Sequence, residues 1–503
     1  MISERPDSAP SPGETVAIID IGSNSARVVV FERDASGYLR ALAGSRASLR
    51  LVEDVDKRGA LTEATMARTS EALRDFKAIA TGAGATRIVT VATAAMRDAS
   101  NGALFGQRLE RELGLQIEII SGAEEARYGF DGAMRGLAVS GGLLFDVGGG
   151  SMQLTTFGRR RRSSDVSLPL GALRLNARFV DSDPPTRPQL RRLRDYVRKS
   201  LAKAGIKRLQ DGRLVGTGGT LRNLAKIDRE AQNYPIASLH GYELPCDRLR
   251  DTVELLASMK EKHRDRLPGL SAERADSIVG GGVAIQTLAE FMRATQVVVS
   301  GQGIREGLAL KLLGIPIGSP QSVKQASLSS LAARFGGWSR EAAVRRENLA
   351  ATLYRALEPG APVTLAVAVR LAAYILDIGR TIDIVNRHEH VADIVLTAEL
   401  NGFTHAELAL LAAVARRAGD RHADIGALAA IGGVGPKFVE RAAIILSLAD
   451  EIEARSPHGP PIAVRSEVNR YVRLSIPVLT SWLEDDLGKR FERAFGRELI
   501  VRH

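Results

Sequence analysis

An internal repeat without gaps is the feature that most constrains how this chain can fold. Residues 19–31, IDIGSNSARVVVF, align on residues 145–157, FDVGGGSMQLTTF, so that Asp20 falls on Asp146. Self-similarity of this kind indicates that one structural unit occurs twice. In each copy an apolar run ends in Asp, small residues follow, and the next run is too rich in β-formers for a helix. The repeat therefore predicts two β-hairpins with glycine-rich turns.

The two hairpins exclude the common glycine-rich nucleotide motifs. A dinucleotide fingerprint or a P-loop needs its glycines to open a helix, whose N-terminal N–H groups hold the phosphate. Two small-residue turns, each behind an Asp, instead suit a site that holds a phosphate chain from both sides, because backbone N–H groups can approach the anion closely. Asp20 and Asp146 are then placed to hold a divalent cation or its waters. The alternative, two purely structural turns, is disfavoured by the duplication.

The sequence around the hairpins predicts two α/β domains that face one another. Helical patterns occur at residues 61–81, with Thr62 as N-cap, and at 105–113, and strand patterns occur at 87–92 and 115–120. Residues 213–225 and 297–309 share a layout of strand, small-residue turn and helix. We expect a flexible tail over residues 1–14, one α/β domain over 15–136 and a second over 137–316.

The C-terminal part of the chain has a different character. A Pro/Gly-rich stretch at residues 314–319 suits a linker, and Ala, Leu and Arg recur at helical spacing beyond it. Strand signals return only around residues 462–474. We therefore expect a separate, mainly helical domain over residues 317–503.

Composition narrows the class of protein and of partner. The chain has 503 residues, too many for one hydrophobic core, and its net charge of +11 favours polyanions: nucleic acid, an anionic membrane or a phosphate-rich substrate. The single cysteine, Cys246, excludes an internal disulfide and a thiolate metal site and suits a reducing cytosol. No uncharged apolar run reaches about eighteen residues, so a membrane span is not expected. We expect a cytoplasmic protein without a membrane partner.

Two further patterns carry alternatives. The stretch GTGGT, residues 216–220, opens a predicted helix, so Gly218, Gly219 and Thr220 have the layout of an anion site, although taken alone a Thr-capped helix start is favoured. The run Arg159 to Arg162 falls at the turn of the second hairpin and predicts four solvated arginines. Aromatic residues make up only 5% of the chain, so a nucleic-acid partner is not expected.

Seven stretches, in order, resemble the exopolyphosphatase/guanosine pentaphosphate phosphohydrolase (Ppx/GppA) family. They are residues 19–30, 91–101, 117–130, 145–154, 167–175, 215–225 and 300–308. The resemblance implies a catalytic half with the duplicated ribonuclease-H-like α/β fold of actin, sugar kinases and heat-shock protein 70. It also implies hydrolysis of a terminal phosphoanhydride by an attacking water.

The same resemblance implies roles for individual residues. It places the catalytic glutamate at Glu125, beside Glu124, where a carboxylate would orient and deprotonate water; such a pair seen alone is typical of a solvated helix start. The implied phosphate contacts are Gly22, Ser23, Asn24, Ser25, Gly148, Gly149, Gly150 and Ser151. Asp146, with Asp20, is implied to hold Mg²⁺ or Mn²⁺. Arg97 is implied to contact the same phosphate, with an ordinary helix-surface arginine as an equal alternative.

Two departures from the family pattern matter. Gln153 stands where the family often has Glu, and a neutral amide is a poorer magnesium ligand. Residues 371–379, LAAYILDIG, resemble the helical domain that longer members share with HD-type phosphohydrolases, but Leu376 stands at the histidine. A second metal site is therefore not expected despite Asp377, His388 and His390, and both histidines are expected at the surface or an interface. The C-terminal helical domain is expected to lengthen a basic channel or to form a homodimer contact.

The sequence thus predicts an exopolyphosphatase that releases orthophosphate processively from the end of inorganic polyphosphate. Three alternatives stay open. The same machinery could remove the 5′ phosphate of guanosine pentaphosphate, which the residues do not separate from the first function. An ATP-using kinase of the same fold superfamily is opposed by the seven-stretch match. A non-catalytic polyphosphate sensor is suggested by Gln153 and the lost histidine.

Overall fold

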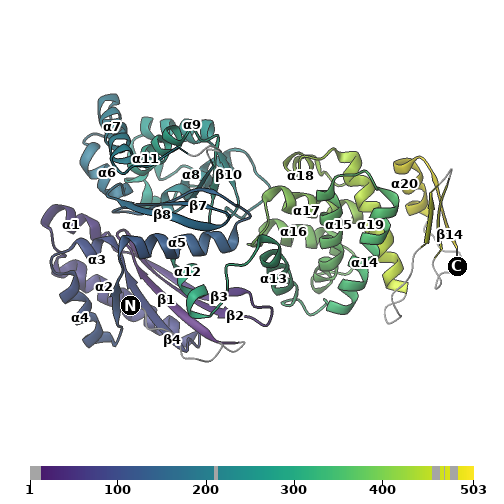
Figure 1. The fold of residues 1–503 in the computed structure, drawn as a ribbon, viewed down its shortest axis with the longest axis horizontal. Helices are drawn as coiled ribbons and strands as arrows, with labels where there is room; N and C mark the ends of the chain where they lie inside the picture. Colours follow the sequence, from purple (N-terminus) through teal and green to yellow (C-terminus); the bar gives the residue numbers. More distant parts are fainter. Residues whose placement is uncertain (1–12, 209–212, 456–464, 469–470, 476–484, 503) are drawn as a thin grey trace. The chain divides into compact units, whose positions relative to one another are not determined.

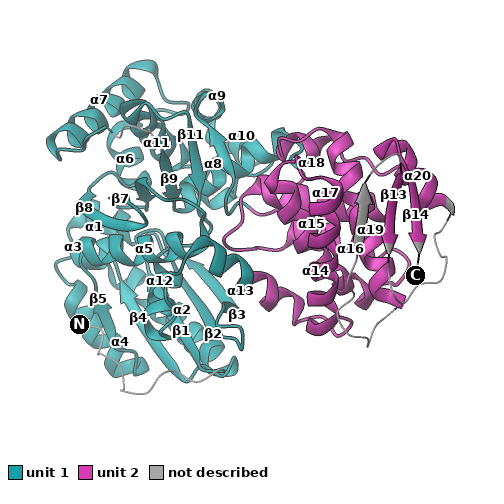
Figure 2. Ribbon diagram, turned by 45° about the vertical axis from the view of Figure 1, so that its right-hand side comes forward, with its two compact units in different colours: residues 1–234, 239–326 teal, residues 235–238, 327–503 magenta. Residues whose placement is uncertain are grey.

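The chain forms two compact units in a computed structural model that describes residues 13–208, 213–455, 465–468, 471–475 and 485–502. Unit 1 comprises residues 1–234 and 239–326, and unit 2 comprises residues 235–238 and 327–503 (Figure 2). Of the tail predicted over residues 1–14, only the last two fall within the described residues. Within the described ranges, no helix is both long enough and apolar enough to cross a membrane.

Unit 1 contains two mixed sheets (Figure 1), which share one strand arrangement except for an additional edge strand in the second. Sheet A has the order β3 (Leu39–Ser48), β2 (Ser25–Arg33), β1 (Thr15–Ile21), β4 (Arg87–Ala92), β5 (Ile117–Ile119). Sheet B has the order β10 (Glu243–Pro245), β11 (Gln296–Val299), β9 (Leu214–Thr217), β6 (Gly142–Val147), β7 (Met152–Gly158), β8 (Arg161–Leu168). In each sheet three antiparallel strands are followed by two parallel ones, and in sheet B the edge strand β10 is again antiparallel. The duplicated α/β fold is therefore confirmed.

The hairpin registers show how closely the two copies correspond. Asp20 on β1 pairs with Arg27 on β2, and Asp146 on β6 pairs with Gln153 on β7. Both aspartates thus stand one residue before the end of the first strand of their sheet. Because β1 and β6 each run parallel to the next strand in the sheet, these ends share an edge with the loops after β4 and β9.

The helices of unit 1 cover both sheets. They are α1 (Leu51–Arg58), α2 (Glu63–Gly82), α3 (Ala94–Asp98), α4 (Gly102–Leu113), α5 (Gly122–Gly136), α6 (Ala172–Phe179), α7 (Arg187–Lys203), α8 (Gly219–Ala231), α9 (Cys246–Ser258), α10 (Glu261–Arg264), η1 (Ala272–Arg274), α11 (Ile278–Met292) and α12 (Ile304–Leu312). Helix α13 (Pro320–Ala332) contains the boundary between the units. The predicted N-cap of α2 is confirmed, since Thr62 Oγ1 accepts from the Thr65 N–H.

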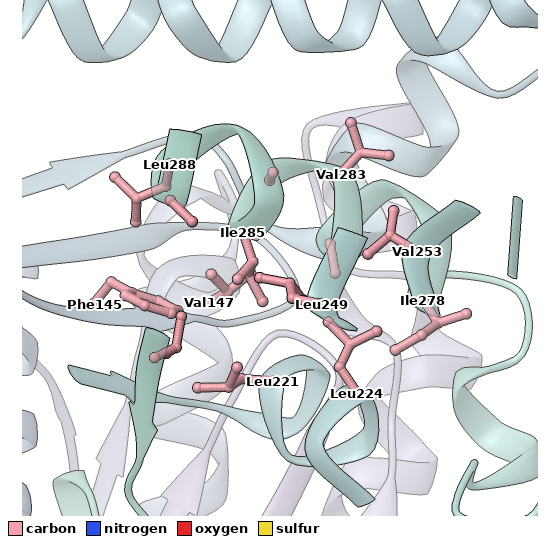
Figure 3. Packing of buried hydrophobic residues seen from close by; sticks show 14 of the residues in the cluster. Phe145, Val147, Leu221, Leu224, Leu249, Val253, Ile278, Val283, Ile285 and Leu288 are labelled. Carbon is pink, nitrogen blue, oxygen red and sulfur yellow. The ribbon is translucent and has the colours of Figure 1, made fainter. Parts of the chain in front are cut away.

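The central strand of sheet B is buried on both faces. Phe145 and Val147 pack against α8 and α11 in one core cluster (Figure 3), whereas Leu144 faces a second cluster with residues of α5. An apolar run without alternation is typical of such a doubly covered strand. The packing fixes the end of β6, and with it Asp146.

Helix α5 lies between the two sheets and against α12. Its Tyr128 packs with the apolar face of sheet A, and its Phe130 packs with that of sheet B. The backbones of α5 and α12 approach so closely that a Cβ on Gly132 would lie 2.0 Å from the carbonyl oxygen of Gly303. Only glycine permits that contact. This packing fixes the start of α12 against the second half of α5.

Unit 2 is mainly helical, as predicted. It contains α14 (Arg340–Leu357), α15 (Val363–Ile375), η2 (Leu376–Thr381), α16 (Arg387–Thr397), α17 (His405–Gly419), α18 (Gly426–Ile431), α19 (Pro436–Arg455) and α20 (Asp485–Phe495). A small sheet follows the order β12 (Arg465–Val468), β13 (Tyr471–Ser475), β14 (Glu498–Arg502). The sheet predicted at residues 462–474 corresponds to β12 and β13, although 462–464 and 469–470 lie outside the described residues. Strand β14 was not predicted.

A buried ion cluster occupies the place of the missing histidine motif. Arg346, whose side chain is 1% exposed, contacts Asp377 at 2.5 Å and Asp450 at 3.0 Å, and Arg387 pairs with the same two carboxylates. Burial lowers the pKa of the adjacent His388 to about 4. His388 and His390 are both half-buried, so their place at the surface or an interface stays a prediction. Asp377 is held by arginines rather than exposed.

One residue of the run Arg159 to Arg162 differs from its prediction, since the other three are exposed as predicted but Arg160 is half-buried. Arg160 donates from Nη1 to the carbonyls of Leu137 and Val139, at 2.7 and 3.0 Å, and from Nη2 to that of Met134. These are carbonyls at and just beyond the end of α5, which a cation satisfies favourably. Arg160 is therefore a structural cap rather than a solvated side chain.

Candidate active site

A pocket of about 130 Å³ lies in unit 1 where the ends of β1 and β6 meet the start of α5. Its walls come from Asp20, Gly22, Ser23, Asn24, Ser25, Arg27, Thr93, Glu125, Asp146, Val147, Gly148, Gly149, Ser151, Thr217, Gly218, Gly219, Arg222, Arg274, Ser300, Gly301, Gln302, Gly303, Ile304 and Arg305. Most of the residues predicted from the repeat and the family resemblance are among them. Both copies of the repeat thus contribute to one site.

The two hairpin turns have the same hydrogen-bond pattern. Gly22 N donates to Ser25 O at 3.1 Å, and Gly148 N donates to Ser151 O at 3.0 Å. The turns also lie in contact, since a Cβ on Gly149 would lie 3.2 Å from the backbone nitrogen of Asn24. The sequence predicted a phosphate site between two turns of small residues. Because the two turns touch each other, larger side chains would not fit between them.

A helix N-terminus satisfies the carbonyls of each turn. Near the start of α1, Arg50 N donates to Asn24 O at 2.9 Å and Val52 N to Ser23 O at 3.1 Å. At the start of α6, the amides of residues 172 and 173 donate in the same way to Gly148 O and Gly149 O, at 2.9 and 3.0 Å. Helix N-termini have free N–H groups to offer. The turns are therefore held rigidly on the side opposite the pocket.

Several side chains in the pocket wall have buried polar atoms without a hydrogen-bond partner, among them Asn24 and Glu125. Asn24 is 4% exposed, and neither its Oδ1 nor its Nδ2 is bonded. The Oε2 atom of Glu125 is likewise buried without a hydrogen bond. Buried polar atoms are nearly always satisfied, so unpaired ones in a cavity wall point to a ligand or water that completes them.

The adjacent glutamates at the start of α5 have different surroundings. Ser121 caps the helix: its Oγ accepts from Glu124 N, while the Glu124 carboxylate accepts from Ser121 N at 2.9 Å. These bonds lower the pKa of Glu124. Glu125 lines the pocket instead. The S-x-x-E spacing of a capping box is a signal that could have separated the two from sequence.

Glu125 is a carboxyl group with a strongly perturbed pKa. Burial and the nearby charges of Asp146 and Asp20 raise its pKa to about 8, against the opposing effect of Arg97. The Nη1 atom of Arg97 lies 3.7 Å from Glu125 Oε2 and donates to Ile120 O at 2.7 Å. Arg97 is therefore not an ordinary surface arginine, but it contacts Glu125 rather than lining the pocket.

Asp20 and Asp146 also titrate above the usual range for aspartate. Burial raises both pKa values, and for Asp20 the charge of Asp146 adds to the effect. Gly218, at φ +97°, comes so close that a Cβ there would lie 2.8 Å from Asp146 Oδ1. No group of three or more acidic, histidine or cysteine side chains in the described residues has metal-site geometry. The protein therefore offers two carboxylates beside an open cavity, a donor set typical of Mg²⁺ that also binds substrate phosphates.

Sequence reasoning missed four arginines in the pocket wall: Arg27, Arg222, Arg274 and Arg305. Burial and mutual repulsion lower the pKa of Arg27 to about 9 and that of Arg274 to about 10. Arg27, Arg222 and Arg305 could have been found from the sequence, because they lie inside stretches that resemble the family. Arg274, on the short helix η1, lies in none of these stretches.

Two other predicted residues lie outside the pocket wall. Gly150 contacts the opposite turn, where a Cβ would lie 3.0 Å from Ser23 Oγ. Thr220 is fully buried on α8, and a Cβ on Gly281 of α11 would lie 2.7 Å from its methyl group. The residue that departs from the family pattern, Gln153, also stands behind the wall, since it donates to Ser151 Oγ at 2.8 Å and to Ser167 Oγ at 3.2 Å.

Ion pairs join the two halves of unit 1 beside the pocket. Arg46 of β3 contacts Glu273 of η1 at 2.5 Å, and Arg50 contacts Asp276. These pairs connect the half that contains sheet A to the half that contains sheet B. They hold η1, and therefore Arg274, against the pocket.

The model of the Ppx/GppA phosphatase family matches residues 29–314, more than half of the chain. This chain belongs to the Ppx/GppA phosphatase family. The resemblance of the seven stretches is thus confirmed. The residues that match the Ppx/GppA family model lie almost wholly within unit 1. The match ends before residue 327, where the main part of unit 2 begins.

Relatives of this Ppx/GppA member include named proteins and a solved structure. Exopolyphosphatase 1 of Mycobacterium leprae is 29% identical over 303 residues, which are 59% of this chain and 89% of that protein. Exopolyphosphatase 2 of Mycobacterium tuberculosis is 33% identical over 315 residues, 59% of this chain and 98% of that protein. The crystal structure of the Aquifex aeolicus Ppx/GppA member is 28% identical, with a TM-score of 0.53, and the match covers 59% of this chain and 97% of that one.

Proposed function

We propose that this protein is an exopolyphosphatase, which hydrolyses the terminal phosphoanhydride of inorganic polyphosphate and releases orthophosphate. The observation that carries the proposal is one pocket lined both by Glu125, a carboxyl group with a raised pKa, and by four arginines. The names of the mycobacterial relatives support the same activity.

The four arginines explain how the pocket would bind a polyanion. Burial and the repulsion of neighbouring arginines lower the pKa values of Arg27 and Arg274, so the pocket holds its positive charge at a free-energy cost. Phosphate oxygens would relieve that repulsion, and planar guanidinium groups bind them through paired N–H donors. The Nδ2 of Asn24 is a further donor without a partner.

Glu125 would act as the general base. A base is most effective when its pKa lies near the working pH, and the pKa of Glu125 is about 8. Its carboxylate would orient the attacking water and take its proton as the phosphorus–oxygen bond forms, while the bridging oxygen leaves with the shortened chain. Arg97 would hold the carboxylate in place, through its contact at 3.7 Å.

A divalent cation, Mg²⁺ or Mn²⁺, fits the two remaining carboxylates. Asp146 and Asp20 would hold it directly or through water, and the bound ion would neutralise charge on the phosphate. Gln153 does not weaken this part of the proposal, because its amide is directed to Ser151 and Ser167 rather than lining the pocket. The same fact removes one argument for a non-catalytic sensor.

The pocket wall favours polyphosphate over guanosine pentaphosphate. None of its described residues is aromatic, so the wall offers a guanine base only the arginine planes, which the phosphate groups themselves would occupy. A polymer that consists only of phosphate needs no such contact. We extend the proposal to a processive enzyme that works in the cytoplasm as a homodimer and without nucleic acid; light scattering on the purified protein would measure the dimer.

The decisive experiment measures orthophosphate release from long-chain polyphosphate, guanosine pentaphosphate and ATP in the presence of Mg²⁺ or Mn²⁺. We expect release from polyphosphate, with loss of turnover in Glu125→Gln. Glu124→Gln is the matched control, since a glutamine still completes a capping box. Release from the guanosine substrate alone, or full activity in Glu125→Gln, would contradict the proposal.

A further inference from the structure

A second cavity, of about 760 Å³, lies within unit 2. Its walls come from the end of α17, the start of α19 and the end of α20, with the residues Arg417, Arg421, His422, Pro436, Lys437, Glu440, Arg441, Arg490, Arg493, Ala494, Phe495 and Gly496. Its volume falls in the range of small-molecule sites. None of these residues belongs to the catalytic pocket.

The cavity holds more positive charge than its carboxylates can balance. Glu440 is the only acidic residue in the described wall, and it is shared: Arg417 Nε and Arg490 Nε each contact it at 2.6 Å. Lys437 and Arg493 are exposed and form no ion pair among the described residues. The cavity therefore presents several cationic groups that lack a counter-charge.

The remaining two arginines of the wall are each paired once. Arg421 contacts Asp486 at 2.8 Å, and Arg441 contacts Glu358 at 3.0 Å. These pairs leave the excess charge of the wall unchanged, because each cation has its own carboxylate. The surplus thus comes from Lys437, Arg493 and the two arginines that share Glu440.

The guanidinium groups are held in fixed positions by the backbone. Arg417 donates to Ala423 O at 3.0 Å, Arg490 donates to Arg417 O at 2.7 Å, and Arg441 donates to Ala494 O at 2.8 Å. Such bonds prevent the cations from separating to relieve their repulsion. The wall also includes Pro436, where the long helix α19 begins, so the positive end of a helix dipole adds to the field.

We propose that this cavity binds an oligophosphate, a short run of linked phosphate groups. Several fixed cations along one cavity match a ligand with several charges better than a single small anion, and arginine forks suit phosphate oxygens. A short inorganic chain and the triphosphate tail of a nucleotide share this chemistry. The inference does not rest on the proposed function, because it concerns unit 2 alone.

Isothermal titration calorimetry on the full-length chain tests the proposal. The Glu125→Gln background keeps the probes intact, and the probes are tripolyphosphate and ATP. We expect two tripolyphosphate sites in this background. Adding Lys437→Glu and Arg493→Glu should weaken one of them by roughly tenfold or more. Both residues are exposed, so the fold should tolerate the change.

The matched control reverses two exposed charges of unit 2 outside the cavity, Arg334→Glu with Arg355→Glu. This variant should keep both sites. Equal binding of ATP and tripolyphosphate at the second site would assign the shared phosphate tail, and binding of tripolyphosphate alone would assign an inorganic chain. A single site in the Glu125→Gln protein, or equal losses in the control, would overturn the proposal.

Discussion

Nη1 of Arg97 lies 3.7 Å from Oε2 of Glu125, and the same nitrogen donates to the carbonyl of Ile120 at 2.7 Å. Ile120 follows strand β5 and immediately precedes Ser121, the N-cap of α5. Arg97 therefore connects the end of β5 to Glu125 in the first turn of α5. Because Arg97 lowers the pKa of Glu125 against the effect of burial, we infer that it is a positioning residue that also keeps part of the glutamate ionised.

Arg97→Met should therefore shift the acid limb of kcat/KM to higher pH and reduce activity at pH 7 by roughly tenfold or more. The neutral side chain removes the charge that favours the carboxylate. A pH–rate profile measures the effect. Arg97→Lys retains the positive charge, so it should restore part of the activity and return the acid limb of kcat/KM to its original pH. If the acid limb did not shift in Arg97→Met, Arg97 would have a purely structural role.

The parts of the fold that were predicted are those with a strong local pattern. The hairpins β1–β2 and β6–β7 show apolar runs around a small-residue turn, which identify a strand pair without any tertiary information. Strand β3 was not predicted, because its residues are mostly small or polar and half-exposed at the edge of sheet A. An edge strand without alternation carries no periodic signal.

The predicted site residues were likewise those carried by local motifs. Asn24 and Gly149 lie in turns that the repeat marks, but Arg274 reaches the pocket only because η1 is fixed across the cleft by ion pairs such as Arg46–Glu273. In sequence, Arg274 cannot be distinguished from the many arginines on the surface. The lowered pKa of His388 could not be predicted for the same reason, since its partial burial against α17 and the ion cluster is a tertiary effect.

Glu125→Gln should stabilise the protein while it removes turnover. The pKa of Glu125 is about 8 in the folded chain, above the unfolded value of 4.5, so the folded state binds this proton more tightly. That contribution to stability is complete below pH 4.5 and is lost as the pH rises to 8. Glutamine stays neutral, so the gain at pH 8 should be on the order of a few kcal/mol.

Thermal melts of both proteins between pH 4 and 9 check this expectation. The two curves should meet at the acid end and diverge above it. Turnover should fall roughly 10²–10⁴-fold. Glu124→Gln, whose pKa is lowered rather than raised, should not become more stable at high pH; a constant gap between wild type and Glu125→Gln would contradict the raised pKa.

Gly218→Ala should impair both stability and catalysis. The residue adopts φ +97°, and a Cβ would lie 2.6 Å from Val147 O and 2.8 Å from Asp146 Oδ1. We expect a loss of about 1–3 kcal/mol in the free energy of unfolding, together with reduced phosphate release because Asp146 must move. Urea titration measures the first effect. Gly158→Ala is the control, since nothing lies within 4 Å of its Cβ position, and equal losses in both variants would disprove the argument.

Arg346→Met should destabilise unit 2 strongly without a direct effect on the catalytic pocket. The substitution leaves Asp377 and Asp450 buried beside one another with less compensation. Removing one partner of a buried ion pair costs about 3–5 kcal/mol.

Hydrogen exchange, read separately over α14, α15 and α19, would locate the loss in unit 2. Arg370→Met is the matched control on the surface: its pair with Glu347 is half-exposed and should be worth less than about 1 kcal/mol. If Arg346→Met were as stable as this control, the buried cluster would contribute nothing to folding. A loss that shrinks at low pH, where the carboxylates accept protons, would identify the uncompensated charge as its cause.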